Sequence, residues 1–205
     1  GFQNSVIGFA NVVVQSNINA FGELAMSGCG AYAKVEGFAF LPITSFTSAI
    51  TTFVGQNLGA EEFDRAKKGA RFGILCSLLI AEGIGVITYV FSPAFIGAFC
   101  DSQAAIAFGV DKAHICALFF CLLAATHCLS AVLRGAGRAM VPMVVMLSVW
   151  CVLRVSILLI AVPITQSINT VNWVYPITWS ISTVVLLIYY HKSDWLHSFQ
   201  REKAK

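Results

Sequence analysis

The chain has 205 residues, of which 58% are hydrophobic and only 11% are charged, and its mean hydropathy is +0.78. A soluble domain carries roughly 25% charged residues, so this composition indicates a membrane protein. The net charge of +3 does not predict a nucleic-acid partner, because the cations cluster at the ends of apolar segments.

Six apolar segments are long enough to span a bilayer, which needs about 20 residues for a helix. The connections between them are short, so neighbouring helices should pack antiparallel as a bundle. The segments cover about residues 1–19, 29–57, 72–91, 104–133, 140–162 and 171–190. We therefore predict an all-α, polytopic membrane protein, with a six-helix transmembrane lobe over residues 1–191 and a basic tail over residues 192–205. Gly1 lies inside an apolar run and is no initiator Met, so we expect a fragment of a longer protein.

The distribution of Lys and Arg predicts the orientation of the bundle. Ten basic residues fall in the loops and tail that would lie on one side of the bilayer, four of them in the segment Arg65–Arg71. The opposite loops, Phe21–Gly28, Gly97–Gln103 and Pro163–Asn172, contain none. Because basic loops stay in the cytoplasm, we predict a multi-pass protein of the cell membrane with both ends of the chain, including the basic tail, in the cytoplasm.

One face of the first helix is lined with amides. At about 100° per residue, Asn4, Asn11, Gln15 and Asn19 fall on a single stripe, together with several glycines. Such a stripe indicates either close helix packing with interhelical hydrogen bonds or the wall of a wet cavity. We predict that it lines a substrate path.

Ionisable residues inside a membrane are costly unless they are paired or hydrated, so each is a functional candidate. Glu36 lies in the second segment, Glu82 in the third and Arg154 in the fifth. For Glu82 the alternative is a protonated acid packed between helices, and for Arg154 it is a tie between helices. We interpret Asp111 and Lys112 as charges near the outer interface, and His114 and His127 as packed neutral imidazoles.

Glu36 is the strongest candidate for a coupling or cation-recognising carboxylate. Phe40 and Thr47 continue its face at helical spacing, which would suit the path of an organic cation. Lys34, two residues earlier, should project from a different side of the helix and extend to the interface.

The sequence contains no motif of a protease, hydrolase or nucleotide-binding enzyme, and we expect no enzymatic activity and no cofactor. The segment EEFDR (Glu61–Arg65) resembles an intramembrane protease motif but lacks its length and its partner histidine. The seven cysteines include no CxxC pair, which predicts reduced buried thiols rather than a metal site.

Several motifs resemble, in order and spacing, the C-terminal half of the multidrug and toxic compound extrusion (MATE) family. They are QSNINAFG (15–22), AKVEGFAFLP (33–42), FVGQNLGAEEFDRAKKGAR (53–71), LRGAGRAMVP (133–142) and WCVLR (150–154). The resemblance implies one six-helix lobe of a twelve-helix antiporter, whose N-terminal six-helix lobe would be its partner. Many members carry a glutamate on the seventh helix, whereas the corresponding first helix here has only amides.

The resemblance implies secondary-active efflux of small amphipathic, often cationic, organic compounds in exchange for Na⁺ or H⁺, by rocking of two lobes about a central cavity. One alternative is a flippase for lipid-linked oligosaccharides, which should present more cations to the cavity. Another is a non-transporting membrane scaffold, in which the amide stripe would be dry and packed.

Overall fold

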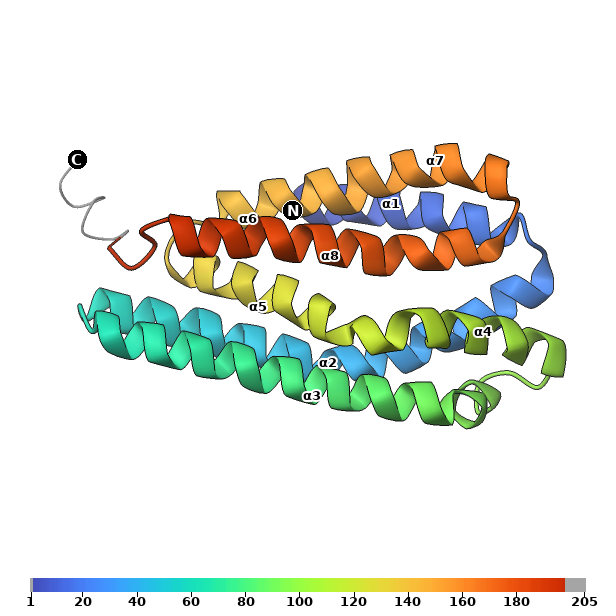
Figure 1. The fold of residues 1–205 in the computed structure, drawn as a ribbon, viewed down its shortest axis with the longest axis horizontal. Coiled ribbons are helices and arrows are strands. Elements are labelled where there is room, and N and C mark those ends of the chain that lie inside the picture. Colours follow the sequence, from blue (N-terminus) through green and yellow to red (C-terminus); the bar gives the residue numbers. More distant parts are fainter. Residues whose placement is uncertain (1, 198–205) are drawn as a thin grey trace.

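The computed structural model describes residues 2–197, with side chains from residue 5 onward, and over this range it is helical without strands. The first three long helices are α1 (Phe2–Asn19), α2 (Glu23–Gly59) and α3 (Phe63–Gly97) (Figure 1). The fourth long unit consists of α4 (Gln103–Cys116), the 3₁₀ turn η1 (Ala117–Phe119) and α5 (Phe120–Gly135). The fifth consists of α6 (Met140–Met146), the π-helical η2 (Leu147–Leu153) and α7 (Arg154–Thr165), and the sixth is α8 (Ile168–Lys192).

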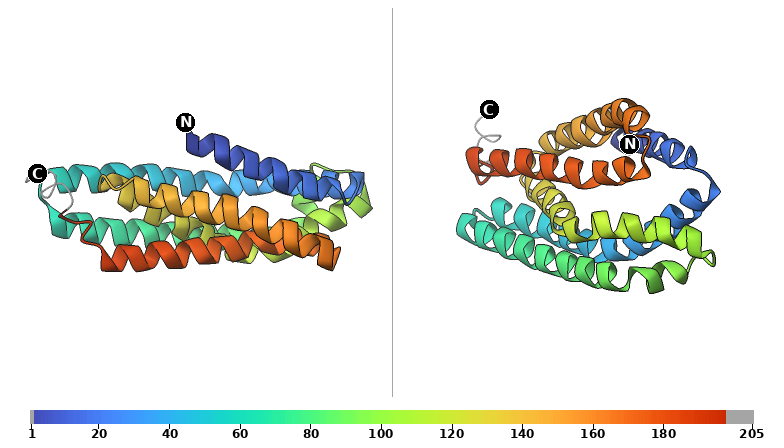
Figure 2. Two further views of the ribbon diagram at one scale, coloured as in Figure 1. Left: turned by 90° about the horizontal axis from the view of Figure 1, so that it is seen from above. Right: turned by 45° about the vertical axis from the view of Figure 1, so that its right-hand side comes forward.

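These six units lie alongside one another as a bundle, which confirms the predicted all-α membrane fold (Figure 1). Five of them are long and apolar enough to cross a membrane, and the exception is α1, whose 18 residues include the amides. The helices form two groups, which diverge in the right-hand view of Figure 2. One group contains α2, α3 and the α4–α5 unit, and the other contains α1, the α6–α7 unit and α8. Contacts of α4 and α5 with α8 join the two groups.

The helices extend beyond the apolar runs at several ends. Arg65–Arg71, which the sequence predicts as a loop, instead forms the first turns of α3, because a helix can continue into water where its side chains are charged. The turn before it contains Glu61, which adopts a left-handed conformation with φ of 60°. The α2–α3 turn, the α5–α6 turn and the end of α8 all lie at the same end of the bundle (Figure 1).

Close backbone contact between α2 and α4 sets the position of the fourth unit. A Cβ atom on Gly109 would lie 2.6 Å from the carbonyl oxygen of Gly28, and a Cβ on Gly28 would collide with the backbone of Ala105. Small residues allow membrane helices to approach this closely. Ser102 begins α4 as its N-cap, accepting a hydrogen bond of 3.4 Å from the backbone N–H of Ala105.

The start of the tail returns to the bundle. Trp195 is only 4% exposed and stacks on Tyr190 of α8, with 5.3 Å between ring centroids. Arg138, between α5 and α6, donates hydrogen bonds to the Tyr189 hydroxyl and to the Asp194 carbonyl, at 3.0 and 3.3 Å. The remainder of the predicted tail, residues 198–205, lies outside the described residues.

Candidate functional site

A cavity of about 570 Å³ lies between the two groups of helices. Its wall is formed by α1, α2, α5, η2, α7 and α8, with Met146 at the end of α6. The wall contains four aromatic residues and five polar or charged residues. The aromatic residues are Phe40, Trp150, Tyr175 and Trp179, and the polar or charged residues are Asn11, Glu36, His127, Arg134 and Arg154. On α5 the wall runs from Leu123 to Arg134, about 17 Å along the helix axis.

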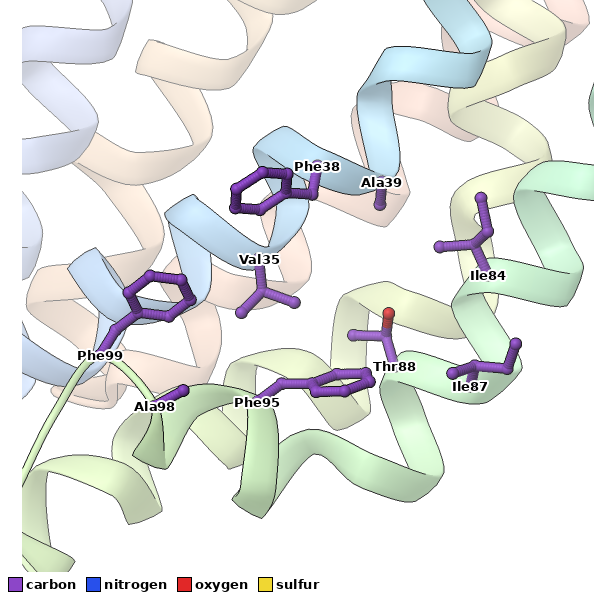
Figure 3. A pocket seen from close by; sticks show the side chains of 9 residues that line it. All are labelled: Val35, Phe38, Ala39, Ile84, Ile87, Thr88, Phe95, Ala98 and Phe99. Carbon is purple, nitrogen blue, oxygen red and sulfur yellow. The ribbon is translucent and has the colours of Figure 1, made fainter.

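Two different faces of helix α2 line hollows in the structure. Glu36 and Phe40, one turn apart, face the cavity. Val35, Phe38 and Ala39 instead line an apolar groove of about 360 Å³ between α2 and α3, shown in Figure 3. Lys34 is exposed and its ammonium nitrogen lies 5.2 Å from the ring centroid of Phe99, so it does project from a different side of the helix than Glu36. This separation was predicted from the two-residue spacing.

Glu36 belongs to a cluster of charged and aromatic groups. The Tyr32 hydroxyl, one turn earlier on α2, donates a hydrogen bond of 3.4 Å to the Glu36 carboxylate. The ammonium nitrogen of Lys112 lies 5.5 Å from the centroid of the same tyrosine ring. The charge of Lys112 is not hydrated, since its side chain is only 5% exposed. Its burial by the close approach of α4 to α2 cannot be read from residue spacing.

Tyr175 of α8 brings two cations together. Its ring centroid lies 4.6 Å from the ammonium nitrogen of Lys112 and 4.7 Å from the guanidinium carbon of Arg154. Aromatic rings attract cations through their quadrupole, and the attraction increases when the pair is desolvated. Lys112 and Arg154, from α4 and α7, are thus held against one ring at the cavity wall.

A local irregularity in α8 helps to position this ring. Pro176 has no backbone N–H, so the carbonyl of Asn172, four residues earlier, lacks its helical donor. The thiol of Cys116 donates to that carbonyl over 3.6 Å. Cys116 lies one turn after Lys112, and this contact therefore ties α4 to α8 next to Tyr175.

Arg154 begins α7 directly after the π-helical segment η2. Segments of this kind occur frequently at functional sites. The guanidinium donates to the Thr178 hydroxyl over 2.7 Å and its central carbon lies 5.2 Å from the Trp150 ring centroid. Its Nε atom is buried and has no hydrogen-bond partner in the protein. The predicted tie between helices therefore exists, through Thr178, but it leaves the Nε–H of Arg154 without an acceptor in the protein.

His127 lies between two aromatic walls of the cavity. Its ring centroid is 4.9 Å from that of Phe40 and 5.4 Å from that of Trp150. Its Nε2 atom is also buried without a hydrogen-bond partner in the protein. The predicted packed histidine therefore lines the cavity, with one ring nitrogen buried and unsatisfied.

The amide stripe of α1 is divided between two situations. Asn11 lines the cavity. Gln15 and Asn19 are exposed and hydrogen bonded to each other, with 2.8 Å between Gln15 Nε2 and Asn19 Oδ1. The side chain of Asn4 lies outside the described residues. The role of the whole stripe in a substrate path stays a prediction, and the structure brings one of its members to the cavity.

Two other candidate residues lie away from the cavity wall. Glu82 on α3 accepts a hydrogen bond of 3.1 Å from the backbone N–H of Cys121, at the start of α5. This N–H follows the 3₁₀ break and belongs to the first turn of a helix, where donors lack intrahelical partners. The Thr47 hydroxyl donates over 2.8 Å to the carbonyl of Thr44 in its own helix.

Four members of the site were not predicted from the sequence: Lys112, Tyr32, Tyr175 and Trp150. Lys112 carried a usable signal, since it is an ionisable residue several turns inside an apolar segment. The aromatic residues carried none, because aromatic side chains are common throughout membrane helices.

The fold and cavity define a class: a helical membrane protein with an open, charged and aromatic-lined cavity between its helices. Comparison with known proteins narrows this class. The family model of MatE matches residues 1–160. The chain therefore belongs to the MatE family.

Relatives and solved structures agree with this assignment. The chain is 26% identical over 187 residues to the "probable multidrug resistance protein YoeA" of Bacillus subtilis, covering 90% of this chain and 40% of the relative. It is 28% identical over 150 residues to the "probable multidrug resistance protein NorM" of Thermotoga maritima, covering 73% of this chain and 31% of that protein. The chain thus spans less than half the length of these relatives.

Among solved structures, a MATE protein in its bent conformation superposes with a TM-score of 0.86 at 15% identity, over 99% of this chain and 45% of that one. A transporter of the MOP superfamily from Pyrococcus furiosus, described as having a binding pocket of reversed polarity, gives a TM-score of 0.85 at 15% identity, over 93% of this chain and 43% of that one. These likenesses show the shared fold of one lobe.

Proposed function

We propose that this chain is one six-helix lobe of a secondary-active efflux transporter. The complete protein would export amphipathic compounds, cationic ones included, in exchange for Na⁺ or H⁺, and a second six-helix lobe would face this one across the cavity. It would act as a carrier and not as an enzyme, in the cell membrane, with the basic cluster Arg65–Arg71 in the cytoplasm.

The observation that carries the proposal is the cavity of about 570 Å³ beside Asn11 and Glu36. Transporters built from repeats bind their substrates between helices near the middle of the membrane. An aromatic wall with a few charged groups accommodates varied amphipathic compounds. The scaffold alternative predicted a dry, packed amide stripe, and Asn11 on the cavity wall argues against it.

Glu36 is the proposed coupling group of this lobe. Its carboxylate faces the cavity, and the cationic side chain of Arg154 lines the same wall. A bound organic cation, Na⁺ or H⁺ would each interact with this carboxylate, so their binding would compete. Competition for one carboxylate is what exchange of an ion for a cationic substrate requires.

The test uses the complete protein in proteoliposomes with an imposed Na⁺ or pH gradient. We expect Glu36→Gln to insert normally and to lose gradient-driven efflux. Transport at the wild-type rate across about pH 6 to 8 would show that Glu36 is structural. Absence of gradient-driven efflux from the unmodified protein, for every amphipathic compound tested, would overturn the proposed function itself.

A further inference from the structure

The cavity carries more positive than negative charge. Arg134 and Arg154 line its wall, and Lys112 is held against the wall residue Tyr175. Among the described side chains on this wall, Glu36 is the one carboxylate. Over residues 5–197 the ion pair found within 4.0 Å is that of His197 with Asp194, so no cation neutralises Glu36 by direct contact. The part of the wall that this chain supplies would thus repel an organic cation more than attract it.

Two buried nitrogen atoms at this wall also lack hydrogen-bond partners in the protein. They are Nε of Arg154, a residue only 4% exposed, and Nε2 of His127. A buried donor without an acceptor is unfavourable, and the penalty is larger for a charged group. A ligand that brings acceptor oxygens to the Arg154 guanidinium would offset the cost of burying this charge, whereas an ammonium group would not.

The neighbours of Arg154 are aromatic. Its guanidinium lies 5.2 Å from the Trp150 ring centroid and 4.7 Å from that of Tyr175, and Trp179 lies 6.0 Å beyond Tyr175. A ligand bound to Arg154 would therefore place its apolar part against aromatic rings. The wall is complementary to an acidic group attached to an aromatic or other apolar body.

We propose that this cavity prefers amphipathic compounds with a carboxylate or phosphate group, which Arg154 binds while the aromatic wall takes the apolar part. Lys112 adds attraction for the acidic group, and Glu36 adds repulsion that prevents very tight binding. This inference rests on the proposed efflux function, because it names the substrate class of the same cavity. An acidic compound would not compete with Na⁺ or H⁺ for Glu36, so its exchange would need a coupling group other than Glu36. The acidic group belongs either to a small organic acid or to a phosphorylated lipid.

The experiment compares two probes of one shape and opposite charge, naphthylacetate and naphthylmethylammonium. Their equilibrium binding is measured on the complete protein in phosphatidylcholine nanodiscs. We expect naphthylacetate to bind about tenfold more tightly, since a hydrogen bond to a charged group contributes a factor of this order. Arg154→Gln should weaken naphthylacetate binding about tenfold, and Glu36→Gln should strengthen it several-fold.

The signs of these effects make the test decisive. For a cation-selective cavity, naphthylmethylammonium would bind more tightly, Glu36→Gln would weaken it and Arg154→Gln would strengthen it. That pattern, or equal binding of both probes, or no binding of naphthylacetate, overturns the proposal. Lys34→Gln is the matched control, because Lys34 is an exposed cation on α2 that does not line the cavity. It should leave both affinities unchanged.

Two further arms complete the design. Replacing naphthylacetate by a polyprenyl phosphate in the nanodisc identifies the source: tighter binding of the lipid assigns the site to a lipid phosphate, and tighter binding of naphthylacetate assigns it to a small organic acid. If Arg154→Gln fails to fold, the isosteric Glu36→Gln still shows whether naphthylacetate binding becomes stronger or weaker when the negative charge is removed. Because binding is measured without a gradient, its result does not depend on ion-coupled transport. Failure of the proposed transport function and failure of the proposed substrate preference can therefore be told apart.

Discussion

The ammonium nitrogen of Lys112 lies 4.6 Å from the ring centroid of Tyr175. This contact joins α4 of one helix group to α8 of the other, and the same ring also holds Arg154. A buried cation is costly without compensation, and contact with an aromatic face supplies about 2 kcal/mol when the pair is desolvated. Tyr175 thus keeps two cations in place at the edge of the cavity.

We expect Tyr175→Leu to destabilise the protein by roughly 2 to 4 kcal/mol, because it removes the ring from both cations and from the packing. Tyr175→Phe is the matched control, since it keeps the ring and should cost much less. Thermal unfolding in detergent measures both variants. Equal loss of stability in the two would show that the hydroxyl, and not the ring, holds this cluster together.

The division of the α1 stripe predicts different effects for two similar amides. Asn11 lines the cavity, whereas Gln15 is bonded to Asn19 on an exposed face. Asn11→Leu should change the relative transport of several substrates at unchanged expression, because it removes a donor and acceptor from the binding wall. Gln15→Leu should change this ranking less.

Ranking of at least several substrates with each variant checks this expectation. If Asn11→Leu leaves the ranking intact but lowers expression, the stripe serves helix packing. A larger change for Gln15→Leu than for Asn11→Leu would place the substrate path along the exposed face instead.

Glu82 should behave as a structural acid. Its carboxylate accepts from the Cys121 N–H at the start of α5. Glu82→Leu leaves that donor unsatisfied and should cost about 1 to 3 kcal/mol of stability. Glu82→Gln keeps an acceptor oxygen and should cost less, with coupled transport retained. Loss of coupling in a stably folded Glu82→Gln variant would instead return Glu82 to the ion pathway.

The proposed orientation can be checked with single cysteines in a cysteine-free protein. Lys67→Cys on the first turns of α3 and Asn169→Cys at the start of α8 both place the thiol on an exposed position. An impermeant reagent added to intact cells should label Asn169→Cys, and label Lys67→Cys after the cells are opened. Labelling of both from the same side contradicts the predicted topology.

The helices and their order could be predicted because length and apolarity are local properties of a segment. A run of about 20 apolar residues has few alternatives to a membrane-spanning helix, and basic residues mark its cytoplasmic end. The same logic placed Lys34 and Glu36 on different sides of α2. It also explains the error over Arg65–Arg71, since charge ends the membrane span without ending the helix.

The convergence of Glu36, Lys112 and Arg154 on one cavity was not predictable in this way. Their meeting depends on how each helix is rotated and how closely it approaches its neighbours. Contact between Gly28 and Gly109 brings α4 against α2, and the π-helical segment 147–153 shifts the helical phase just before Arg154. Rotation and phase arise from packing between residues far apart in the chain, so the tertiary structure alone turned an expected interfacial lysine into a buried member of the site.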